Sequence, residues 1–312
     1  MAGRRVPKEK SRAGSFFSAT LVLWIVSIWF EILFYRRSEL LYVVFGALFY
    51  QSANWTVRAL VSKDPLFVNT SVSLLHSTIT SASGLIKGMV TSFCSIGRLL
   101  GWPWLPLDSD PKPYDVLFIL VSQWLSYGSH GMFEHSQLVG GTWSGAYAAL
   151  CFSCGYFAYD QWDMLLYQLY SGWIPAILVH HLVLLICFTL ALYRNVTINY
   201  LILTLICELH SIFLHVRRLR RMAGVRDAKS IVVKVEWILN WLTFVFARVV
   251  PHILITAKLV VDASKFDRGV ELPLALSGMA GMNLLNAFLG IDLINAVKKE
   301  SKYQKRDHPR RE

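Results

Sequence analysis

Two adjacent histidines, His180 and His181, stand near the start of the apolar run GWIPAILVHHLVLLICFTLALY, residues 172 to 193. A neutral imidazole can act as a general base, as a nucleophile that accepts an acyl group, or as a metal ligand. Neighbouring helical residues point about 100° apart, so one ring can face a cavity while the other lies toward its rim. A histidine that is only hydrogen-bonded within the fold is the alternative. The pair therefore marks a candidate site inside an apolar helix.

The composition indicates an integral membrane protein. Hydrophobic residues make up 54% of the 312 residues and charged residues only 16%, whereas a soluble domain has about 25% charged residues. The net charge of +11 comes from basic residues at the N-terminus, at 217–229 and at the C-terminus. Membrane topology and contact with anionic headgroups explain these clusters better than nucleic-acid binding does. The five cysteines lie in or beside apolar runs, which argues against a disulfide framework.

A spanning helix needs about 20 mainly apolar residues, and this criterion gives seven or eight transmembrane segments. Asn54 and Arg58 interrupt the apolar pattern of the second. Eight spans place all three basic clusters on one side, which the positive-inside rule predicts to be cytosolic, so we favour eight. The segments are 16–35, 39–60, 67–90, 142–160, 173–193, 196–216, 231–257 and 272–297.

The widest gap between spans, 91–141, contains a Pro-rich stretch followed by an apolar stretch that is too short to span. It predicts an interfacial or re-entrant helix with Trp102, Trp104 and Trp124 at headgroup depth.

Ionisable residues within the spans are the remaining functional candidates, because a charge at mid-bilayer costs roughly 2.5 to 3.5 kcal/mol. Arg248 implies a carboxylate partner, for which Glu208 and Asp163 are the candidates; a structural ion pair without chemistry is the alternative. Asp160 and Asp163 could bind a divalent cation or be solvated acids at a helix end, and we predict no metal site. The candidate cavity-lining or lipid-binding residues are His76, Asp160, Asp163, Ser211, Arg248 and His252.

Five ordered blocks resemble the TLC-domain family, which includes ceramide synthases and the translocon-associated TRAM protein. The blocks are SLLHSTITSASGL, WSGAYAALCFSCGYFAYDQWDML, LVHHLVLLICF, TLICELHSIFLHVRRL and NWLTFVFARVVPHI. Within the family, the segments CGYFAYDQWDM, VHH and ELHSIFLHVRRL are most similar to the branch associated with plasma-membrane phospholipid composition and fluidity.

The resemblance implies an all-α, polytopic helical bundle around a central, lipid-accessible cavity. His180 and His181 match the histidine pair of the ceramide synthase acyl-transfer centre. The two aspartates of that centre fall on Glu208 and Ser211, so Ser211 removes a carboxylate. His180, His181 and Glu208 are accordingly the predicted catalytic residues if the protein is an enzyme.

The predicted organisation has four parts. A basic cytosolic arm (1–15) precedes N-terminal transmembrane helices (16–65). A TLC domain (66–297) with an insertion near 91–141 follows, and a basic cytosolic tail (298–312) ends the chain.

Two function classes remain open. The resemblance favours a non-enzymatic regulator of phospholipid acyl-chain composition and membrane fluidity that binds membrane lipids or acyl chains, needs no cofactor and resides in the plasma membrane. The alternative is an acyltransferase, with acyl-CoA as co-substrate, in which Glu208 orients the imidazole; the endoplasmic reticulum is the alternative location. A cargo receptor ranks third, because the tail lacks a dilysine signal at the required position.

Overall fold

The computed structural model describes residues 8–82, 116–170, 176–225, 230–266 and 269–306. These residues form helices joined by short turns, and no strand occurs among them. The all-α prediction is therefore confirmed. The N-terminal half of the described chain contains α1 (Lys8–Phe34), α2 (Leu41–Leu60), α3 (Pro65–Ala82), α5 (Val116–Met132), α6 (His135–Val139) and α7 (Ala146–Leu166).

The C-terminal half consists of longer helical units. α8 (Ala176–Arg194) is followed by α9 (Ile198–Thr204), which continues through a 3-10 turn into α10 (Glu208–Met222). α11 (Ile231–Thr243) continues through the π-helical turn η4 (Phe244–Val249) into α12 (Val250–Val261). α13 (Glu271–Arg306) is the last helix.

Five helical units among the described residues are long and apolar enough to cross a membrane. They are Ala13–Phe34, Ala176–Arg194, Ile198–Met222, Ile231–Val261 and Glu271–Glu300. The other three predicted segments are also helices, α2, α3 and α7, but they are richer in polar residues. These three carry most of the buried polar side chains described below.

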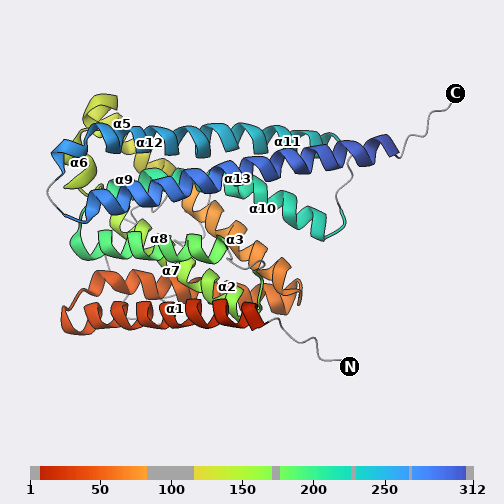
Figure 1. The fold of residues 1–312 in the computed structure, drawn as a ribbon, viewed down its shortest axis with the longest axis horizontal. Coiled ribbons are helices and arrows are strands. Elements are labelled where there is room, and N and C mark those ends of the chain that lie inside the picture. The colour runs from red at the N-terminus through yellow and green to blue at the C-terminus, as the bar shows by residue number, and fades with distance from the viewer. Residues whose placement is uncertain (1–7, 83–115, 171–175, 226–229, 267–268, 307–312) are drawn as a thin grey trace, which may run out of the picture.

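The basic parts of the chain gather at one end of the bundle. The start of α1, the end of α10 and the end of α13 all lie on the side where both chain termini leave the bundle (Figure 1). This arrangement agrees with the topology expected from the charge pattern. We keep the assignment of that end to the cytosol as a prediction of the positive-inside rule.

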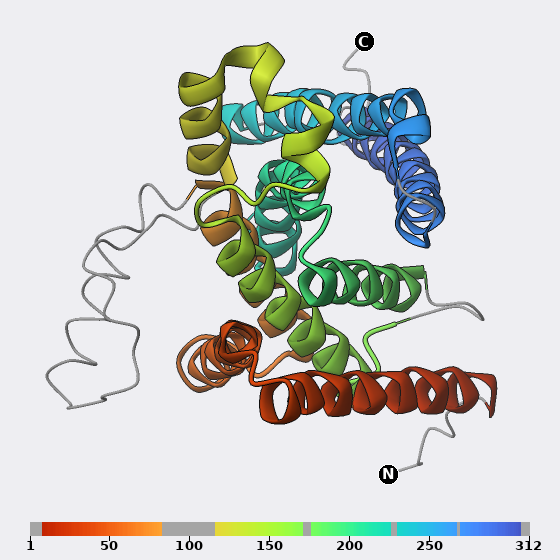
Figure 2. The same cartoon turned by 90° about the vertical axis from the view of Figure 1, so that its left-hand side faces the viewer.

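Glycines bring α2 and α7 together. A Cβ atom on Gly155 would clash with the backbone of Val43, and one on Gly46 would lie 2.8 Å from the carbonyl oxygen of Phe152. Small residues allow such close approach between membrane helices, where van der Waals packing replaces the hydrophobic driving force. Figure 2 shows α7 crossing the middle of the bundle, with α1 and α2 on one side and α12 and α13 on the other.

The predicted interfacial helix corresponds in part to α5, which is kinked at Gly128, where φ is +66°. Trp124 on this helix is exposed. Trp102 and Trp104 lie outside the described residues.

Candidate functional site

Helical periodicity places polar side chains of α2 and α7 opposite each other. Starting from the two glycines at the contact, steps of four residues follow one face of each helix. On α2 these steps reach Tyr50, Asn54 and Arg58, and on α7 they reach Tyr159 and Asp163. The close packing at the glycines thus positions an amide and a guanidinium beside the α7 carboxylates.

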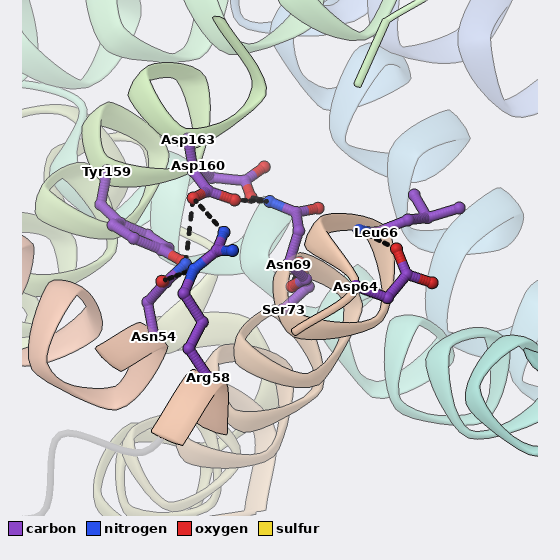
Figure 3. A network of polar contacts seen from close by, with 9 residues as sticks. All are labelled: Asn54, Arg58, Asp64, Leu66, Asn69, Ser73, Tyr159, Asp160 and Asp163. Carbon is purple, nitrogen blue, oxygen red and sulfur yellow. Dashed lines mark hydrogen bonds and ion pairs between the residues drawn. The ribbon is translucent and has the colours of Figure 1, made fainter. Parts of the chain in front are cut away.

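A third helix completes this arrangement, which we call the carboxylate cluster: Asn54, Arg58, Asn69, Tyr159, Asp160 and Asp163. α3 begins at Pro65, where the missing N–H costs nothing, and Asp64 caps it by accepting a hydrogen bond from the Leu66 N–H at 3.0 Å. One turn later, Asn69 reaches into the bundle from α3 (Figure 3).

The two carboxylates share the amide of Asn69. Its Nδ2 donates to Asp160 Oδ1 at 2.6 Å and to Asp163 Oδ2 at 3.1 Å. Asp163 Oδ1 also accepts from Asn54 Nδ2 at 3.0 Å and lies 3.5 Å from Arg58 Nη2. Both carboxylates are buried, at 4% and 3% exposure, so the interpretation of these acids as solvated helix-end residues is wrong. Hydrogen bonds from two amides and an ion pair with Arg58 offset the cost of burying these carboxylates.

His181 lies beside the carboxylate cluster. Its Nδ1 is 3.5 Å from Asp160 Oδ2, and both side chains are almost fully buried. An imidazole whose Nδ1–H faces a carboxylate keeps Nε2, on the opposite edge of the ring, as a proton acceptor. The position next to Asp160 therefore suits His181 to accept a proton or an acyl group at Nε2.

The neighbouring histidines have different surroundings. His76 is fully buried, its ring stacks on Tyr156 with centroids 3.7 Å apart, and its Nδ1 lies 3.1 Å from the Tyr50 hydroxyl. His180 is partly exposed, its ring centroid lies 5.5 Å from that of His181, and Arg248 and His252 are among its charged or titratable neighbours.

The structure pairs the predicted site residues differently from the expectation. Glu208 accepts a hydrogen bond from the Ser77 hydroxyl at 2.6 Å, whereas the carboxylate nearest His181 is Asp160. The reason lies in the fold, because α3 contacts both α10 and α7. The Ser77 hydroxyl on α3 therefore lies next to Glu208 on α10. Asp160, rather than Glu208, is therefore the carboxylate that lies beside the His181 imidazole.

The expected ion pair of Arg248 is also absent. Neither Glu208 nor Asp163 lies within ion-pair distance of the guanidinium, because Asp163 is held by α2 and α3. Arg248 Nη2 instead donates to Ser211 Oγ at 2.8 Å, and Nη1 lies 3.5 Å from Asn286 Oδ1. The prediction of a carboxylate partner for Arg248 was wrong.

The backbone around Arg248 is unusual because of Pro251. A proline ring within a helix clashes with the carbonyl four residues earlier, which widens the ladder locally. The π-helical turn Phe244–Val249 ends just before this proline. His252 Nδ1 donates to the Arg248 carbonyl oxygen at 2.6 Å, a carbonyl being able only to accept. π-helical turns of this kind are frequent at functional sites.

Within the described residues, no group of three or more histidine, cysteine, aspartate or glutamate side chains is arranged to hold a metal ion. Asp160 and Asp163 are instead engaged by amide and guanidinium donors, as shown above.

Sequence reasoning missed the role of Asn54, Arg58 and Asn69. The signal was present, because Asn54 and Arg58 are four residues apart in an otherwise apolar helix and thus share one face. Asn54 and Arg58 were interpreted only as interruptions of the apolar pattern in the second predicted segment.

Comparison with known proteins supports the assignment that the blocks suggested. A family model described as TLC domain matches residues 66–295. TLC domain-containing protein 2 of Danio rerio is 33% identical over 105 residues, which cover 33% of this chain and 41% of the relative. The match therefore spans less than half the length of that curated relative. No solved structure matches. Because the family model covers most of the chain, this multi-pass membrane protein belongs to the TLC-domain family.

Proposed function

We propose that this protein controls the acyl-chain composition of membrane phospholipids, and so membrane fluidity, by binding acyl chains within its helical bundle. The observation that carries the proposal is an apolar groove between α8, α9, α12 and α13. It is lined by side chains such as Leu184, Leu201, Ile255, Leu274 and Met279. An acyl chain in such a groove would lie on the same helix, α8, that carries both histidines. The resemblance to the fluidity-associated branch supports the same conclusion.

A second candidate function is acyl transfer, which the contact between His181 and Asp160 favours. In this reaction His181 Nε2 takes the proton of an acceptor hydroxyl as the oxygen attacks the carbonyl of an acyl-CoA thioester. The new carbon–oxygen bond forms, the carbon–sulfur bond breaks, and the proton passes to the leaving thiolate. Asp160 stabilises the protonated imidazole, a role that a carboxylate facing Nδ1 performs in other histidine-based sites.

We further propose residence in the plasma membrane and contact between the basic end of the bundle and anionic headgroups. Arg220 and Arg221 close α10 at that end. Each basic residue near an anionic leaflet contributes about 1 kcal/mol to such contact. Fractionation of cells expressing a tagged chain tests the location.

Lipidomics of cells lacking the protein tests the proposed function and separates it from sphingolipid synthesis. Ceramides and phospholipid acyl chains are quantified together, in cells rescued with the wild-type chain or with the double variant His180→Ala, His181→Ala. Unchanged ceramides, together with shifted phosphatidylethanolamine and phosphatidylcholine unsaturation that wild type reverses, are expected. Loss of specific ceramides would instead assign the protein to ceramide synthesis, and unchanged lipids of both classes would contradict the proposal.

A further inference from the structure

The guanidinium of Arg248 has more donors than the described residues satisfy. It carries five N–H groups in a rigid fork. Only the bond to Ser211 is short, at 2.8 Å, while the Asn286 Oδ1 and Cys207 carbonyl oxygens lie at 3.5 Å. Nε is buried and has no hydrogen-bond partner. Burying such a donor unpaired costs free energy that a ligand could recover.

The position of Arg248 keeps its charge away from both membrane surfaces. It lies 13 residues before the end of the helical unit Ile231–Val261, or about 20 Å along the helix axis, and farther still from its start. A side chain cannot snorkel over that distance. In the described part of the chain, no carboxylate lies within 4 Å to neutralise it. The guanidinium therefore has no carboxylate counterion among the described residues, although it lies far from both membrane surfaces, where an unpaired charge is most costly.

Asn286 adds a second unpaired donor beside the guanidinium. Its residue is 4% exposed, its Oδ1 faces Arg248, and its Nδ2 is buried without a hydrogen-bond partner. The two amide atoms belong to one planar group, so Nδ2 stays within a few ångströms of Arg248. A guanidinium and an adjacent amide N–H are donors that suit a carboxylate or phosphate oxygen.

The apolar groove ends close to a second group of polar residues, which we call the donor cluster. It comprises Arg248 and Asn286 with the adjacent His180, Cys207 and His252. On each of the four helices that line the groove, one helical turn separates a groove-lining residue from a residue of the donor cluster. The pairs are Leu184 and His180, Thr204 and Cys207, Ile255 and His252, and Met282 and Asn286. The helices run alternately in opposite directions (Figure 1), and α8 and α12 each contact both α9 and α13. The apolar groove thus ends within about one to two helical turns of the Arg248 guanidinium and Asn286.

The groove fits one chain better than two. Its lining on α13 runs from Glu271 to Met282, 11 residue steps or about 16 Å, which is about half of the 30 Å hydrocarbon core and so one leaflet deep. The cavity volume is only about 80 Å³, so a bound chain would lie along an open groove with one side toward the lipid.

We propose that Arg248 and Asn286 bind the anionic head of a single-chain lipid, a carboxylate or a phosphate, whose acyl tail lies in this groove. The inference rests on the proposed function, because it takes the groove as the acyl-chain site. It adds the class of ligand: one chain with one negative head. The outer end of the groove carries the Arg194–Glu271 ion pair, so that end is already neutralised and does not compete for an anion.

Equilibrium binding to the full-length protein in phosphatidylcholine nanodiscs tests this inference. The probes are radiolabelled oleate at a pH where its carboxylate is ionised, lysophosphatidate with the same chain, and neutral oleyl alcohol. At least one anion is expected to bind about tenfold or more tightly than the alcohol, as hydrogen bonds to a charged group predict. The tighter of the two anions identifies the head as carboxylate or phosphate. Equal binding of all three probes would overturn the inference.

Three variants sharpen the test. Arg248→Gln is expected to reduce binding of the anion to the level of the alcohol; if this variant does not fold, Asn286→Leu serves in its place. Gly278 faces Cys187 Sγ across the groove, with 3.4 Å to an added Cβ, so Gly278→Leu should weaken binding of every probe. Gly281→Leu is the matched control, because no atom lies within 4 Å of an added Cβ there.

The outcomes separate this inference from the proposed function. Anion binding that is insensitive to both Arg248→Gln and Gly278→Leu overturns the inference, even if lipidomics shows the expected change in phospholipids. Binding that follows the pattern above supports the ligand class, even if lipidomics shows no change, in which case only the proposed function fails.

Discussion

Replacing Asn69 by leucine should destabilise the bundle by removing two hydrogen bonds to buried carboxylates. The side chain links α3 to α7 through one nitrogen that donates to both Asp160 and Asp163, at 2.6 and 3.1 Å. Leucine has the same number of side-chain heavy atoms, with the same branching, but no donor. The substitution therefore tests the hydrogen bonds rather than the packing.

The structure sets the expected magnitude. A hydrogen bond to a charged group contributes about 1.5 to 3 kcal/mol, and Asn69 makes two. Asp163 keeps Asn54 and Arg58 as partners, so its share of the loss lies at the low end of that range. We expect the free energy of unfolding to fall by about 3 to 4 kcal/mol.

Unfolding titrations with SDS in mixed micelles measure this change. Asn283→Leu is the matched control, because Asn283 makes one hydrogen bond, to the neutral Thr256 hydroxyl at 2.9 Å, and should lose only about 0.5 to 1.5 kcal/mol. Equal losses in the two variants would refute the reasoning, since Asn69 would then not be holding two buried carboxylates.

Three further changes have expected outcomes. Gly155→Leu should cost about 1 to 3 kcal/mol of unfolding free energy by forcing α2 and α7 apart, with the open position Gly281→Leu as control; equal unfolding midpoints would contradict the close contact. Arg248→Gln should accumulate in membranes like wild type, because it leaves no buried carboxylate unpaired; strongly reduced accumulation on immunoblots would indicate a carboxylate partner after all. At the outer end of α12, desolvation alone would raise the pKa of Asp262, but hydrogen bonds from two lysines hold it below the ordinary value. Its contribution to stability is therefore present above about pH 4, the unfolded value, and lost as the pH falls through the lower folded value. The difference in unfolding midpoint between wild type and Asp262→Asn should shrink only below that pH, and a difference that shrinks on approaching pH 8 would contradict the assignment.

The helical fold was predictable because apolar length and charge asymmetry act locally along the chain. Each of the eight expected segments contains a helix, and the basic clusters lie at one end. The relation of His181 to Asp160 was not predictable in this way. The two residues lie on consecutive helices, and their contact depends on how α7 and α8 rotate about their axes, which no local pattern specifies.

Arg248 shows why the charge partners were assigned wrongly. Pairing each buried cation with a buried acid assumes that the protein neutralises itself. Here Asp163 is instead bound by Asn54, Asn69 and Arg58. Asn54 and Arg58 were interpreted only as interruptions of the second apolar segment, and the role of Asn69 was missed. The absence of an Asp163 partner for Arg248 depends on the three-dimensional packing, in which polar side chains of α2 and α3 surround Asp163 on α7.

The most direct test of the account compares phospholipid acyl chains in cells that lack the protein and are rescued with wild type, with Gly278→Leu, or with the control Gly281→Leu. A side chain at Gly278 enters the apolar groove, where an added Cβ would lie 3.4 Å from Cys187 Sγ, whereas one at Gly281 meets nothing within 4 Å. The account predicts that all three chains accumulate equally, and that wild type and Gly281→Leu restore phosphatidylethanolamine and phosphatidylcholine unsaturation while Gly278→Leu does not. Full restoration by Gly278→Leu would contradict it.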